Sequence, residues 1–169
     1  MISENEYAPY YKNYIEPFAN NEKGIVKNLT DSQEEFDSYM RKLPKEKHNF
    51  AYAEGKWTVK EVIQHIIDTE RVFMYRALSF ARNGENALPG FDQDVFSMNS
   101  FAQERDYYEL LNEMATLRIS TAQMFCWFHE EVLTRIGTAS GNPMSVRAIG
   151  YLLSGHQMHH FKVIQERYC

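Results

Sequence analysis

Residues 57–67 read Trp-Thr-Val-Lys-Glu-Val-Ile-Gln-His-Ile-Ile and mark the clearest helix start in the sequence. Thr58 and Glu61, three positions apart, form the capping-box pattern, in which each side chain bonds to the other residue's backbone amide. Apolar residues then recur at helical spacing up to about Gly84, and glycine is a common residue just beyond a helix end. The pattern predicts a long amphipathic helix over residues 58–83.

The same periodicity predicts three further helices on either side of this one. They run from about Glu22 to Leu43, from about Asp106 to Ile136, and from a cap at Ser145 to about Tyr168. Residues 84–103 show no clear period and form an unusually long connection between helices 2 and 3. No stretch alternates with period two for long enough to predict a strand. We therefore expect an all-α fold, a four-helix bundle with a long crossover loop between helices 2 and 3.

Length and charge narrow the class of protein. The 169 residues predict a single domain, 1–169, in which residues 1–21 form an aromatic N-terminal arm. The formal net charge is −5, with 18 Lys and Arg scattered along the chain, which argues against nucleic acid as a partner. The apolar stretches are far shorter than the roughly 20 residues that span a bilayer. Because the N-terminus is also acidic and lacks an apolar segment, we expect a cytoplasmic protein with no membrane partner.

Several potentially reactive residues have no companions in the sequence, and we expect them to be structural. Cys126 and Cys169 are too far apart to suggest a disulfide framework. Cys126 lies in an apolar helical run and is expected to pack as a small hydrophobe, whereas Cys169 is expected to fray without a role. His48 and His129 are expected at the surface.

The sharpest local feature is Gly155-His156-Gln157-Met158-His159-His160, inside the last predicted helix. His156 and His160 are four positions apart and therefore point from the same face, one turn apart. His159 lies about 60° from His156 on the other side, so spacing alone leaves it open as an alternative. The simpler interpretation is that these imidazoles only form hydrogen bonds with neighbours.

His65 supplies a third imidazole from a different helix. It lies within a run of isoleucines and should face the core, where it needs a hydrogen bond or a ligand. Alone it would most simply be a satisfied core histidine, but metal sites in bundles are built from facing helices. Three neutral imidazoles suit Zn, Ni, Fe or Cu, and three protein ligands leave a coordination position open for water or substrate.

The chain resembles the DinB-like superfamily of metal-binding four-helix bundles. The matching pieces are residues 55–65 with Asp68-Thr69-Glu70-Arg71, then Pro89-Gly90-Phe91-Asp92-Gln93-Asp94, and finally residues 155–160. The resemblance implies that His65, His156 and His160 hold the metal, and so selects His160 over His159. Some relatives are thiol S-transferases that use bacillithiol, mycothiol or glutathione, one is a maleylpyruvate isomerase, and others are described as metal-dependent hydrolases.

These features predict a divalent metal (Zn, Ni or Fe) that activates a thiol or water for S-transfer or hydrolysis of a small-molecule substrate. A low-molecular-weight thiol is then the expected co-substrate. The alternatives are a structural or sensory metal, or an interaction bundle with ordinary core histidines. We also expect a homodimer, because two-fold pairs are the commonest soluble oligomers.

Three carboxylates are candidates for an accessory catalytic role. Asp92 and Asp94 lie in the crossover loop and could approach the metal as a base or as an acceptor for a ligating imidazole. Their alternative role is to shape a turn or cap a helix. Asp68 shares the face of His65 and could orient an imidazole, or be an ordinary solvated helix residue.

Overall fold

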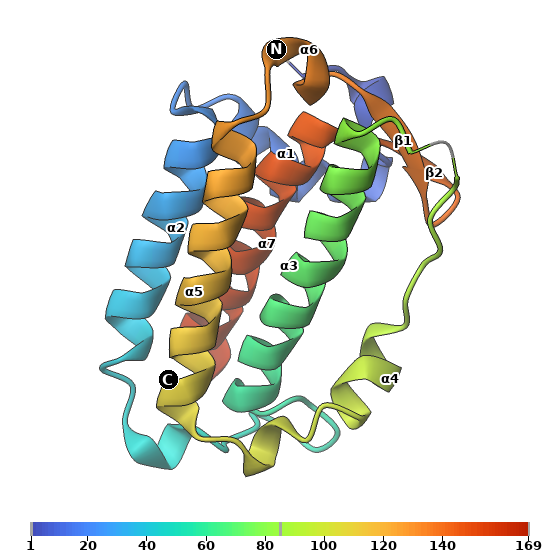
Figure 1. Ribbon diagram of the computed structural model, residues 1–169. Coiled ribbons are helices and arrows are strands. Elements are labelled where there is room, and N and C mark those ends of the chain that lie inside the picture. Colours follow the sequence, from blue (N-terminus) through green and yellow to red (C-terminus); the bar gives the residue numbers. More distant parts are fainter. Residues whose placement is uncertain (1, 85, 169) are drawn as a thin grey trace.

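The computed structural model describes residues 2–84 and 86–168. Four long helices form the bundle: α2 (Gly24–Met40), α3 (Val59–Ala81), α5 (Tyr107–Cys126) and α7 (Val146–Arg167). Both α5 and α7 pack against α2 and α3, so the four helices form a ring around a shared interior (Figure 1). The predicted all-α four-helix bundle is confirmed. Within the described ranges, no helix is both long and apolar enough to cross a membrane.

The direction of the helices explains the long crossover. α3 and α5 are neighbours that run the same way, and α2 and α7 run the opposite way (Figure 1). The chain must therefore return along the whole bundle between α3 and α5. This connection is more ordered than the predicted loop over residues 84–103, because it contains α4 (Gln93–Met98) and the 3-10 turn η4 (Ala102–Glu104).

The predicted helix caps are confirmed. The Glu61 amide donates to Thr58 Oγ1 at 3.3 Å, and the Thr58 amide donates to Glu61 Oε2 at 2.7 Å. At the start of α7, the Ala148 amide donates to Ser145 Oγ at 3.1 Å. Each cap satisfies an amide that has no partner within its helix, and so fixes where that helix begins.

The N-terminal arm is more regular than expected. It contains the 3-10 turns η1 (Glu4–Glu6) and η2 (Pro9–Tyr11) and then the helix α1 (Lys12–Ala19), which packs along α7. A Cβ atom at Gly155 would lie 1.9 Å from the Tyr14 carbonyl oxygen. Because only glycine tolerates this approach, Gly155 is the residue that lets α1 lie against α7 beside the histidines.

The third predicted helix is too long. α5 ends at Cys126, and just beyond it Phe128 is buried and packs against Phe125, with 5.4 Å between ring centroids. The short helix α6 (Glu130–Leu133) follows α5. Much earlier in the chain, the 3-10 turn η3 (Lys45–Lys47) lies in the connection between α2 and α3.

A β-hairpin replaces the loop expected before the last helix. Strands β1 (Ile136–Ala139) and β2 (Asn142–Ser145) pair antiparallel, with Ile136 opposite Ser145. Ser140 and Gly141 have φ of 52° and 75°, the positive values that the tightest hairpin turns require. The expectation of no strand was wrong because four-residue strands are too short to show a clear alternation.

The expected exposure of two side chains, those of His48 and Cys126, is also wrong. His48 is 6% exposed, stacks on Tyr107 with 3.5 Å between centroids, and has a ring nitrogen 3.1 Å from the Leu43 carbonyl oxygen. Cys126, the last residue of α5, is exposed rather than packed as a small hydrophobe. His129 is exposed as expected, and Cys169 lies outside the described residues.

The core consists of two apolar clusters with a polar layer between them. At its centre the Arg118 guanidinium donates to both carboxylate oxygens of Glu70 at 2.8 to 3.1 Å. Arg118 also donates to the Leu29 carbonyl and to Ser32 Oγ, both at 2.9 Å, and Thr121 Oγ1 donates to Glu70 at 2.6 Å. This network joins three of the four helices.

Replacement of Arg118 by Met should destabilise the fold by about 3 to 5 kcal/mol, because Glu70 would remain as an uncompensated charge in the interior. Chemical denaturation followed by the helical circular dichroism signal measures the change. The control is Lys162→Met, which removes an exposed pair with Glu166 and should leave stability nearly unchanged. Equal small losses in both variants would contradict the structural role of the buried pair.

Candidate metal centre

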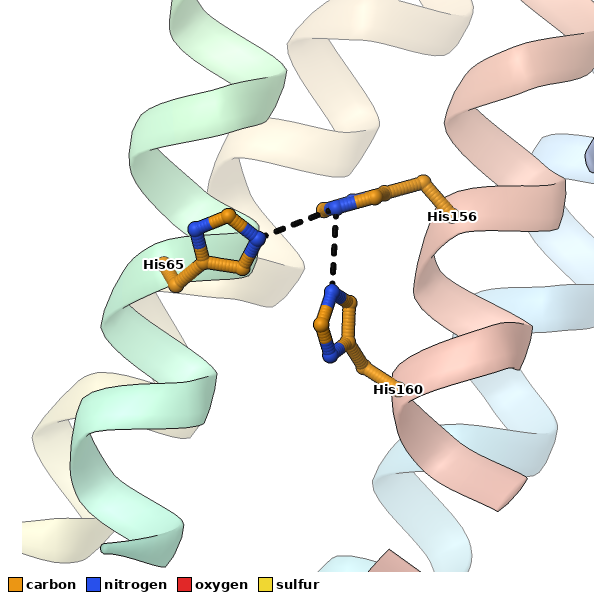
Figure 2. A group of neighbouring side chains, drawn as sticks. All are labelled: His65, His156 and His160. Carbon is orange, nitrogen blue, oxygen red and sulfur yellow. Dashed lines mark hydrogen bonds between the residues drawn. The ribbon is translucent and has the colours of Figure 1, made fainter. Parts of the chain in front are cut away.

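Three imidazoles from two helices converge on one point. Figure 2 shows His65 on α3 facing His156 and His160 on α7. His156 Nε2 lies 3.1 Å from His65 Nε2 and 3.1 Å from His160 Nε2. All three nitrogens lie within 4.8 Å of one another. The rings are steeply inclined to each other, with interplanar angles of 62° to 74°.

This arrangement fits a metal ion better than a hydrogen-bond network. The Nε2 atom of a neutral imidazole carries either one proton or one lone pair, so His156 Nε2, which is common to both short contacts, can make only one good hydrogen bond. One Nε2 contact in the set therefore lacks a proper donor–acceptor match. Three nitrogens about 2.1 Å from one ion in tetrahedral directions lie about 3.4 Å apart, close to the spacing of the two short contacts.

Burial keeps the three side chains neutral. Desolvation lowers the pKa of His65 to about 4 and, together with the charge of its neighbours, lowers that of His160 to about 3. The pKa of His156 is lowered well below its ordinary value by burial and by the two adjacent imidazoles. Near neutral pH all three therefore offer lone pairs, which is the form that binds a transition metal.

Neighbouring aromatic side chains hold the rings in place. Trp57, just before α3, packs on the His65 ring with 4.8 Å between centroids. Tyr14 of α1 lies 6.1 Å from the His156 ring and 5.2 Å from the His159 ring. His159 itself is exposed and lies outside the set of three, so the structure separates the two histidines that spacing had left open.

The candidate carboxylates are placed in different surroundings. Asp92 is the N-cap of α4 and accepts from the amides of Asp94 and Val95 at 2.9 and 3.1 Å. Asp94 lines a cleft of about 280 Å³ that His160 also lines. Asp68 accepts from Gln64 at 2.9 Å, and it lines a separate cleft between α3 and α4. Of the three, Asp94 is the carboxylate that shares a cleft with a member of the histidine set.

A larger cleft of about 550 Å³ opens onto all three imidazoles. Its other walls come from η2, α1, α3, the crossover and the hairpin, and include Tyr11, Tyr14, Thr69 and Arg76. Thr69 and Arg76 follow His65 on one face of α3, a spacing that is visible in the sequence. The tyrosines could not be placed from the sequence, because their approach depends on how α1 docks against α7.

Comparison with known proteins identifies the family and the fold. The family model described as the DinB superfamily matches residues 28–164. No curated protein matches in sequence. YfiT from Bacillus subtilis, described as a probable metal-dependent hydrolase with an unusual four-helix bundle topology, superposes with a TM-score of 0.72 at 15% identity, over 84% of this chain and 82% of YfiT.

Two further structures share the fold at low identity. A mycothiol-dependent maleylpyruvate isomerase gives a TM-score of 0.67 at 10% identity, over 82% of this chain but only 58% of that protein. The DinB-like protein YjoA from Bacillus subtilis gives 0.59 at 17% identity, over 85% of this chain and 89% of that one. These structural similarities support the four-helix bundle fold of this chain.

Metal titration should separate the candidate ligand histidines from their neighbour. We expect the wild type to bind one equivalent of zinc, and His156→Ala and His160→Ala to lose most of that affinity because each removes one of three ligands. The matched control is His159→Ala, one position from His160, which should keep wild-type affinity. Loss of zinc in His159→Ala with retention in His160→Ala would refute the assignment.

The buried imidazoles should make the metal-free protein sensitive to mild acid. An unfolded chain protonates His65 near pH 6.5, whereas the folded protein protonates it only near pH 4, so the unfolded state binds more protons between these values. Stability with chelator present should fall as the pH drops through this window, by up to about 1.4 kcal/mol per pH unit for this group.

Denaturation at pH 7 and pH 5 measures this dependence. His65→Gln should show a smaller loss between the two pH values than the wild type, whereas His129→Gln, an exposed control, should match the wild type. The same loss in His65→Gln as in the wild type would show that the His65 ring is not the source.

Proposed function

The chain belongs to the DinB superfamily, and we propose that it is a metal-dependent enzyme acting on a small molecule, with His65, His156 and His160 as ligands of a divalent transition metal. The observation that carries this proposal is the convergence of three neutral imidazoles, that of His65 buried and those of His156 and His160 half-buried, at the wall of an open cleft. A closed structural site would supply four protein ligands and would need no adjoining cleft.

The ligand set favours activation of a thiol or water. A metal held there supplies Lewis acidity, which lowers the pKa of a thiol or water bound to it. Because the three imidazoles carry no negative charge, they leave the cation's charge uncompensated and favour an anionic nucleophile beside them. The fold neighbours described as a hydrolase and as a mycothiol-dependent isomerase are in keeping with these two nucleophiles.

The chain's own residues have separable roles in this proposal. Trp57 fixes the His65 ring, and the approach of α1 through Gly155 brings Tyr14 over His156 and His159. Asp94, in the smaller cleft that His160 also lines, is the candidate carboxylate to accept a proton from the nucleophile. Asp92 caps α4 and so fixes the position of Asp94 rather than acting itself.

Turnover assays with the zinc-, nickel- and iron-loaded protein test the proposal. We expect one metal form to accelerate the reaction of a low-molecular-weight thiol with an electrophile, or the hydrolysis of an ester or amide, above the rate of metal in buffer. His65→Ala should abolish the acceleration, and Asp94→Asn should lower it while leaving metal content unchanged.

The control for metal loading is His159→Ala, which is expected to bind metal as the wild type does. If metal-loaded wild type leaves every thiol–electrophile pair and every ester at the background rate, the enzyme proposal fails. The three histidines would then form a metal site that has no catalytic role.

A further inference from the structure

Two arginines are buried to 2% exposure, and they differ in how their charge is balanced. Arg118 is neutralised by the Glu70 carboxylate. Arg76, on α3, has no carboxylate partner within residues 2–84 and 86–168. Burial lowers its pKa, and the neighbouring side chains that act on this pKa are those of Tyr11 and Tyr10. Because a guanidinium keeps its proton in proteins, Arg76 places an uncompensated positive charge inside the molecule.

The contacts of Arg76 orient the guanidinium without neutralising it. Its Nη2 donates to the Pro89 carbonyl oxygen at 2.9 Å and to Ser140 Oγ at 3.0 Å. The guanidinium lies over the Phe73 ring at 4.7 Å from the centroid. These contacts hold the side chain between the crossover and the hairpin, so that little entropy is lost when it binds a ligand.

The cleft that contains the histidines also contains Arg76, and its described lining includes no aspartate or glutamate. A divalent cation at the histidines would add two positive charges to that of Arg76. A neutral or cationic ligand would leave this charge buried and unpaired, which is costly in a desolvated site. The electrostatics of the cleft therefore favour an anionic group on the molecule that fills it.

The spacing along α3 indicates where that anionic group lies. His65 and Arg76 are eleven residues apart on one face, so their Cα atoms are separated by about 16 Å along the helix axis. Thr69 lies between them, is 4% exposed, and its buried Oγ1 has no hydrogen-bond partner. Burial raises the pKa of Tyr11, so its hydroxyl beside Arg76 stays protonated and able to donate.

We propose that Arg76 is a specificity-determining residue that binds a carboxylate of the substrate or co-substrate at the end of the cleft remote from the metal. The proposal rests on the proposed function and names its substrate class: an elongated small molecule with a nucleophilic or reactive group at the histidines and a carboxylate at Arg76. The Thr69 hydroxyl meets a polar group between the two ends.

The chemistry of this end of the cleft favours a carboxylate over a phosphate. The flat guanidinium fork matches the two oxygens of a carboxylate, and one positive charge balances its single negative charge. Phosphate sites more often combine several cations or the amides at a helix N-terminus. Here one guanidinium is accompanied by the Tyr11 hydroxyl, and the position lies within α3 rather than at its start.

A series of ω-mercaptoalkanoates of increasing chain length, each paired with its neutral amide, tests the proposal by calorimetric titration of the zinc-loaded protein. We expect the acid to bind at least about tenfold more tightly than its amide, with a maximum at one chain length. Arg76→Met should remove this preference and leave the affinity for the amides unchanged. Zinc content and circular dichroism establish that the variant is folded and loaded.

Arg76→Lys is the second variant, and it provides the test if Arg76→Met does not fold. It keeps the charge but loses the fork, so it should retain a reduced preference for the acid. An unchanged preference in both variants, or equal binding of acids and amides by the wild type, overturns the carboxylate assignment.

Alkanoates without a thiol separate this proposal from the proposed function. If no thiol binds the metal but plain alkanoates still bind more tightly than their amides in an Arg76-dependent way, the carboxylate site stands and thiol activation fails. If mercapto acids and mercapto amides bind equally well, thiol binding stands and the role of Arg76 fails.

Discussion

The proposed metal site depends on one constraint, that the Nε2 atoms of three histidines on two helices converge on a common centre at about the length of a metal–ligand bond. His65 reaches this centre from α3, and His156 and His160 reach it from successive turns of α7. A shift of either helix by a single residue would turn its imidazole away by about 100°. The register between α3 and α7 is therefore the structural quantity on which a metal site would depend.

The polar layer of the bundle is well placed to fix this register. Glu70 lies little more than one turn beyond His65, and its bonds to Arg118 and Thr121 tie α3 to α5. On α7, Gln157 follows His156 and donates to the Gln33 side chain of α2 at 2.7 Å. Buried polar pairs of this kind add little net stability but penalise a slipped arrangement, because each slip leaves a group unpaired. We interpret the layer as the device that aligns the helices carrying the imidazoles.

The parts of the structure that follow local rules could be predicted from the sequence. The Thr58 and Ser145 caps, the apolar stripes and the His156–His160 spacing depend on neighbours a few positions away, and the apolar run around His65 indicates that it faces the core. The hairpin at Ser140-Gly141, the early end of α5 and the burial of His48 against Tyr107 depend on tertiary contacts that no local pattern carries. Arg76 lies on the same face of α3 as His65, but only the structure shows that it lacks a carboxylate partner within the described part of the chain.

The most direct test of the convergence is the position of the ion in the protein itself. X-ray diffraction from zinc-loaded crystals, with anomalous scattering at the zinc edge, locates the ion independently of any assumption about its ligands. The account predicts one ion about 2.0 to 2.1 Å from Nε2 of His65, His156 and His160, at the wall of the large cleft. An ion held at the surface by His159, or a His65 ring beyond coordinating distance of the ion, would contradict it.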